Sequence, residues 1–97
     1  MNAFIIYDVS TKSKEVKDKL VLMGYWNSWK ATSNANIYYL PSNSLWKPDC
    51  ELAQAKRDIT NVIAALNAED PNHPIILQRC IILSVNPWEG IEGVAVI

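Results

Sequence analysis

One carboxylate, Asp8, stands where an apolar stretch gives way to hydroxyl and amine side chains. Residues 4–10 are largely β-branched and aromatic, which predicts a central strand buried on both faces. Because side chains alternate along a strand, we expect Asp8 to share a face with Phe4 and Ile6. An acid at the end of a central strand is a frequent position for catalysis, so Asp8 is the first candidate for chemistry.

Other polar residues are predicted to gather at the same end of the fold, where the first helix also begins and its free N–H groups favour anions. A carboxylate that binds Mg²⁺ beside phosphate-binding donors suits metal-assisted phosphodiester cleavage. One carboxylate needs waters, substrate oxygens or an acid from a dimer partner to complete the metal site. Asp8 is thus the candidate catalytic and metal-binding residue, and the candidate nucleic-acid contacts are Ser10, Lys12, Lys14, Lys30 and Asn34, with Ser33 and His73 nearby.

A structural role for Asp8 is equally open, in which the carboxylate accepts hydrogen bonds from N–H groups of the following turn. His73 has no acid or cysteine partner in the sequence and makes a poor zinc site. Cys50 and Cys80 are too few for a disulfide framework. Trp46 is expected, with Trp88, at the opposite rim, where closing the core is favoured over stacking on bases.

Composition suits one ordinary globular domain spanning residues 1–97, with 49% hydrophobic and 20% charged residues. No apolar run predicts a membrane span, and the N-terminus reads as a strand instead of a signal peptide, so a cytoplasmic location is expected. The net charge is −1. Positive charge collects in the first half, where it would meet a phosphate backbone or form a solvated helix face.

The hydrophobic pattern predicts two helices among several strands. The first helix, over residues 13–23, carries an apolar stripe of Val16, Leu20 and Met23 and ends at Gly24. The second, capped by Asp49 and ending near residue 67, has one apolar face and a polar face. That apolar face comprises Leu52, Ala55, Ile59, Val62, Ile63 and Leu66, against Lys56, Arg57 and Asp58 on the polar face. Strands are predicted over residues 4–10, 25–29, 36–40, 75–85 and 94–97, with a loop over 41–48.

This order, βαββαβ with an extra terminal strand, predicts an α+β, ferredoxin-like antiparallel sheet with both helices on one face. The other face is left open. Apolar residues of the first and last long strands would form a patch there larger than most monomers expose. A homodimer that buries the two open faces against each other is therefore expected.

The opening residues 4–10, followed by a lysine-rich helix that ends at Gly24, resemble the small CRISPR-associated adaptor/nuclease (Cas-two-like) family, and still more its SinR-like relatives. The resemblance implies a ferredoxin-like homodimer joined through the open sheet faces, with residues 94–97 as a strand that pads the partner. It also implies that Asp8 matches an acid linked in some members to Mg²⁺-dependent cleavage of RNA or DNA. The chain departs from the family at residues 25–30, where an Arg- and Gln-rich segment is usual.

Two functions follow as hypotheses. The first is a dimeric nucleic-acid-binding protein with Mg²⁺-dependent endonuclease activity through Asp8. The alternative is a non-catalytic protein-interaction or regulatory module on the same dimer scaffold. A nuclease should keep the carboxylates of two copies within reach of one metal, whereas an interaction module needs only the surface.

Overall fold

The computed structural model describes residues 1–30 and 36–85, and its elements alternate between short strands and two helices. The first strand and helix match the predicted ones within two residues. In chain order the elements are β1 (Asn2–Val9), α1 (Ser13–Leu22), β2 (Ser28–Lys30), β3 (Ile37–Tyr39), β4 (Ser44–Lys47), α2 (Leu52–Glu69) and β5 (Leu77–Val85).

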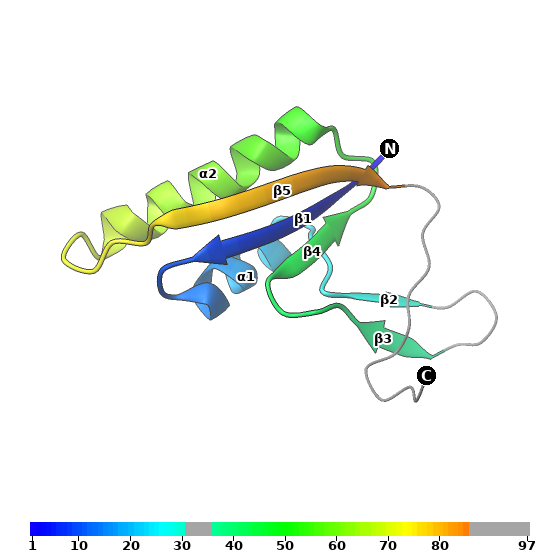
Figure 1. Cartoon of the computed structure of the whole chain (residues 1–97), viewed down its shortest axis with the longest axis horizontal. Helices are drawn as coiled ribbons and strands as arrows, with labels where there is room; N and C mark the ends of the chain where they lie inside the picture. Colours follow the sequence, from blue (N-terminus) through cyan, green and yellow to red (C-terminus); the bar gives the residue numbers. More distant parts are fainter. Residues whose placement is uncertain (31–35, 86–97) are drawn as a thin grey trace.

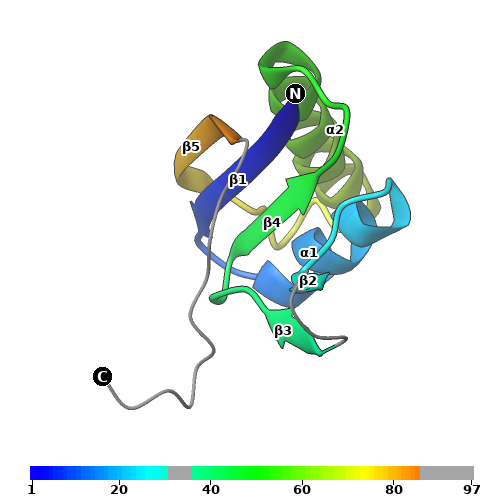
Figure 2. The same cartoon turned by 90° about the vertical axis from the view of Figure 1, so that its right-hand side faces the viewer.

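A three-stranded antiparallel sheet of order β4-β1-β5 forms one layer, and α1 and α2 form the other (Figures 1 and 2). β2 and β3 pair separately as a small antiparallel hairpin. An isolated bridge joins Trp26 to Trp46 and so connects the chain before β2 to the free edge of β4. The predicted α+β class with a mostly antiparallel sheet is confirmed.

Within the described residues, the helices cover one face of β1. Ala3, Ile5 and Tyr7 are buried under the helices, whereas Ile6 on the opposite face is 44% exposed. Asp8 lies on the same face as Ile6, as the alternation predicts. The expectation that this strand is buried on both faces was wrong, because both helices pack on the same side of the sheet.

The segment predicted as a loop over residues 41–48 contains β4, the strand that lies directly beside β1. Its Leu45 is fully buried and pairs with Ile5. Four residues between two prolines are too few to show the alternation of apolar and polar side chains that identifies a strand. The segment is extended because it pairs with β1.

The first helix ends as predicted. Leu22 is the last helical residue and Met23 the C-cap, and Gly24 follows with φ of 97°, a left-handed conformation that glycine adopts without strain. The N–H groups of Met23 and Gly24 donate to the carbonyl oxygens of Leu20 and Val21, which closes the helix.

The second helix begins two residues later than predicted, at Leu52, with Glu51 instead of Asp49 at the N-cap position. Asp49 adopts a left-handed conformation with φ of 50° and does not cap the helix. Leu52 is 40% exposed and does not belong to the buried stripe of α2, contrary to the prediction. Asp58, assigned to the polar face, is instead buried within the apolar face.

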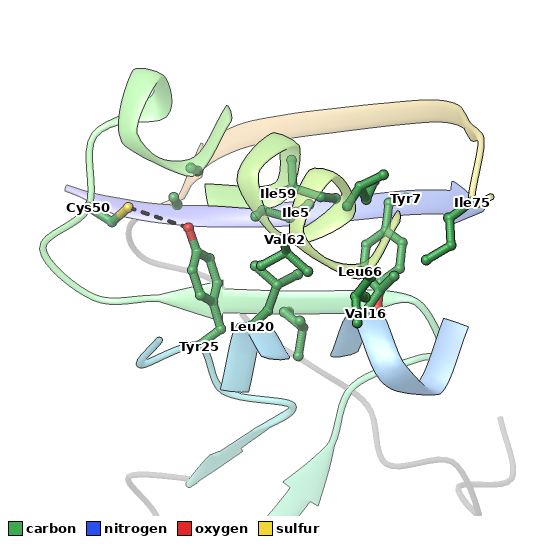
Figure 3. Packing of buried hydrophobic residues seen from close by; sticks show 14 residues of the cluster. Ile5, Tyr7, Val16, Leu20, Tyr25, Cys50, Ile59, Val62, Leu66 and Ile75 are labelled. Carbon is green, nitrogen blue, oxygen red and sulfur yellow. Dashed lines mark hydrogen bonds between the residues drawn. The ribbon is translucent and has the colours of Figure 1, made fainter. Parts of the chain in front are cut away.

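The core lies between the sheet and the helices (Figure 3). Its largest fully buried side chains are Tyr7, Tyr25, Ile5, Leu20, Leu45, Ile59 and Val16. No helix in the described part of the chain is long and apolar enough to cross a membrane. Trp88 and the predicted strand 94–97 lie outside the described residues.

Candidate functional site

Asp8 lies near the end of β1, on the sheet face opposite α1 and α2. Its carboxylate accepts a hydrogen bond from Arg79 of the neighbouring strand β5, with Nε 2.5 Å from Oδ2. Arg79 is the cross-strand partner of Asp8, so strand register brings the two charges together. The Asp8 side chain remains 45% exposed, and that of Arg79 83%. Asp8 is therefore held by an in-chain cation and not by N–H groups of the following turn.

Ser10 links the segment that follows β1 to the segment that precedes β5 through two hydrogen bonds. Its N–H donates to the carbonyl oxygen of Ile76 at 3.0 Å, and its hydroxyl accepts from the N–H of Ile76 at 2.8 Å. A register shift between Asp8 and Val9 marks the end of the regular ladder just before this contact. Ser10 therefore has a structural role in the described chain.

Lys12 joins the same end of the fold to the turn after α2. Its Nζ donates to Asp70 Oδ2 at 2.9 Å and to the carbonyl oxygen of His73 at 3.1 Å. Asp70 also contacts Nδ1 of His73 at 3.1 Å through its other carboxylate oxygen, so the expectation that His73 has no acid partner was wrong. The hydrogen bond from Lys12 and then that from His73 hold the pKa of Asp70 below its usual range.

The structure brings Asp8, Ser10, Lys12 and His73 to one end of the sheet, as predicted, but leaves Lys30 elsewhere. Lys30 lies in the β2–β3 hairpin, which extends to the side of the molecule away from the end of β1 (Figure 1). Lys14 is exposed on the first turn of α1, where Asp18 pairs with it at 2.9 Å and its hydrogen bond raises the pKa of Lys14. Ser33 and Asn34 lie outside the described residues.

Within residues 1–30 and 36–85, no three histidine, cysteine, aspartate or glutamate side chains gather into a group suited to a metal. Asp8 therefore belongs to no such group among the described residues. Mg²⁺ prefers octahedral coordination by oxygen, so waters, substrate oxygens and a second copy would have to supply the remaining ligands. Arg79 would also compete with any cation for Asp8.

A second group of polar residues, which the sequence reasoning missed, lies inside the core. The buried carboxylate of Asp58 accepts hydrogen bonds from Tyr25 Oη at 2.8 Å and from Gln54 Nε2 at 2.6 Å. Tyr25 also points toward Cys50, whose Sγ lies 3.9 Å from the hydroxyl oxygen (Figure 3). Burial, followed by the hydrogen bond to Asp58, raises the pKa of Tyr25 far above its usual value.

The spacing of α2 contained a signal for this group. Asp58 stands three residues after Ala55 and four before Val62, which places it on the buried stripe of the helix. A carboxylate at such a position requires a buried donor, and Tyr25 from the segment after α1 supplies it. The hydrogen bond between Tyr25 and Asp58 therefore holds the segment after α1 against α2.

The uncovered sheet face carries a continuous row of apolar side chains. Cross-strand pairs place Phe4 beside Leu83 and Trp46, and Ile6 beside Ile81. Ile81 is 58% exposed and Leu83 45%. Trp26, bridged to Trp46, continues the row and is 55% exposed. The Asp8–Arg79 ion pair stands at one end of this open face.

A scan of family models and searches of curated proteins and solved structures found no match to this chain.

Proposed function

We propose that this chain is a ferredoxin-like protein related to the CRISPR-associated adaptor/nuclease family and working in the cytoplasm. The strand order β5-β1-β4 supports this fold, since the Trp26–Trp46 bridge adds a fourth chain segment beside β4. Both helices lie on one side of that sheet, which is the arrangement of the split βαβ plan.

We further propose that two copies form a homodimer through the open sheet face. Exposed Ile6, Ile81, Leu83 and Trp26 together are more than scattered surface residues, because strand pairing makes them neighbours. A two-fold dimer would bury the same row from both copies.

The assembly test compares two apolar-to-lysine substitutions. Ile6→Lys places a charge in the open face and should dissociate the dimer, whereas Leu22→Lys, at an 83% exposed position on α1, should not. Sedimentation or light scattering at micromolar concentration measures the mass. A folded wild-type monomer, or equal dissociation by both variants, would contradict the open-face dimer.

The role that this geometry supports best is that of a non-catalytic interaction or regulatory module. One observation carries this proposal: two charged groups at the end of the sheet that catalysis would need, Asp8 and Lys12, are already paired within the chain. Arg79 holds Asp8, and Asp70 holds Lys12. These ion pairs leave a largely apolar surface, which suits contact with a protein.

Metal-dependent cleavage of RNA or DNA is the second candidate, favoured by the position of Asp8. Its half-exposed carboxylate stands on the face through which two copies are proposed to meet, so a second Asp8 would be the nearest source of another ligand. In this function Ser10, Lys12, Lys14, Lys30 and Asn34 would be the nucleic-acid contacts, and binding would weaken with salt.

A nuclease assay separates the two roles. Purified protein is incubated with single-stranded RNA or duplex DNA, with and without Mg²⁺ or Mn²⁺, beside Asp8→Asn and Arg79→Gln. The non-catalytic role predicts no cleavage by any of the three. Metal-dependent cleavage that Asp8→Asn abolishes would overturn it, and Arg79→Gln should then lower the metal concentration needed, because Asp8 loses its competing cation.

A further inference from the structure

β5 presents a long strand edge on the side away from β1. The strand runs from Leu77 to Val85 and pairs with β1 along one side. Along its other side, no strand of residues 1–30 or 36–85 pairs with it. Exposed strand edges are templates for another strand, and proteins usually protect them with lysine, proline or a cover. β5 contains neither lysine nor proline.

The backbone groups on this outer edge can be assigned from the ladder. The N–H of Tyr7 donates to Asn43 on the β4 side, so the alternate residues Ile6 and Asp8 direct their backbone groups toward β5. Ile6 pairs with Ile81, which makes Ile81 a residue bonded to β1. Cys80, Ile82 and Ser84 must then direct their N–H and C=O groups outward.

We propose that this edge pairs antiparallel with β5 of a second copy, about a two-fold axis at Ile82. Regular pairing with β1 extends from Arg79 to Val85, because the register shifts between Asp8 and Val9, and Ile82 is the middle of that segment. In this register Ile81 meets Leu83 of the second copy, so two exposed apolar side chains cover each other. Both Arg79 side chains stand at the ends, far from each other.

The partial burial of side chains along β5 favours a second copy of β5 as the strand that pairs with this edge. Ile82 points toward the helices but is only half-buried, so α1 and α2 leave part of its side chain uncovered at the edge of the sheet. A second Ile82 directly opposite would complete that side with a side chain of the same kind. The remaining pair, Cys80 opposite Ser84, matches two small side chains.

Cys80 and Ser84 distinguish this edge contact from the proposed open-face dimer. Cys80 and Ser84 pair with Tyr7 and Ala3, whose side chains lie on the helix-covered side of the sheet. Stacking of two open faces would not bring these positions together. Edge pairing would instead join two sheets into one six-stranded sheet.

Cross-linking tests the register directly. Ser84→Cys should form disulfides with the native Cys80 of a second copy, since hydrogen-bonded antiparallel partners lie about 5.5 Å apart at Cα, within disulfide range. Gln78→Cys, also exposed, is the matched control and lies far from Cys80 of the second copy in this register. Burial raises the pKa of Cys80, so oxidation is run at mildly alkaline pH.

We expect Ser84→Cys to cross-link on the order of tenfold faster than Gln78→Cys or the wild type, because pairing raises the effective thiol concentration. Cys80→Ser added to Ser84→Cys should abolish the product, and Ile6→Lys should leave it unchanged even if the open-face dimer dissociates. Equal rates at positions 84 and 78, or a product that survives Cys80→Ser, would overturn the proposed edge pairing.

Discussion

Removing the hydroxyl group should lower the free energy of unfolding for one of two buried tyrosines and leave it unchanged or raise it for the other. Tyr25→Phe deletes a 2.8 Å hydrogen bond to the buried carboxylate of Asp58. Tyr7→Phe deletes a buried hydroxyl that has no hydrogen-bond partner among the described residues. The two substitutions remove the same atom from side chains of similar burial, so each controls for the other.

The magnitudes follow from what each deletion leaves behind. After Tyr25→Phe, Asp58 retains the bond from Gln54 but loses one donor. Hydrogen bonds to charged groups contribute about 1.5–3 kcal/mol, so stability should fall by about that amount. Tyr7→Phe leaves nothing unpaired and removes the desolvation cost of the hydroxyl, so stability should hold or rise by about 1 kcal/mol.

Urea denaturation followed by circular dichroism measures both effects. A change in the midpoint at constant slope identifies a change in stability alone. Equal losses in the two variants would mean that the bond between Tyr25 and Asp58 contributes nothing beyond packing. A larger loss in Tyr7→Phe would show that its hydroxyl has a partner and that the assignment of the unpaired group is wrong.

Three further predictions concern packing, backbone and pH. Ile59→Ala in the core of α2 should cost about 2–5 kcal/mol, and Lys56→Ala on its exposed face no more than about 0.5 kcal/mol, by urea denaturation. Equal costs would mean that α2 is rotated. Gly24→Ala should lower stability by about 1–2 kcal/mol because alanine is strained at φ of 97°, and an unchanged melting temperature would contradict this. Burial raises the pKa of Tyr7 to about 12 and that of Tyr25 further. Stability should therefore be unaffected by these groups below about pH 10 and fall as pH rises toward the folded pKa values, a loss that Tyr25→Phe should reduce.

The elements with strong local signals were predictable. The helix predicted over residues 13–23 formed over Ser13–Leu22, because Val16 and Leu20 repeat at helical spacing and Gly24 follows in a left-handed conformation. The face of Asp8 followed from strand alternation alone. These features depend on neighbours within a few residues, where local geometry decides the outcome.

β4 and the surroundings of Asp58 depended on residues distant in sequence. The four residues Ser44–Lys47 became a strand because β1 lies beside them, and Asp58 is tolerated in the core because Tyr25 donates to it from 33 positions away. No local pattern records such partners.

For the candidate site, too, some features followed from the sequence and others only from the tertiary structure. The sequence alone placed an acid at the end of β1 and hydroxyl and amine groups after it. Only the tertiary structure paired Asp8 with Arg79 and Lys12 with Asp70, and carried Lys30 away on a separate hairpin. A charge's partner is set by strand register and by the docking of turns, which bring together side chains 58 to 71 positions apart. Its availability for chemistry is therefore a property of the folded chain.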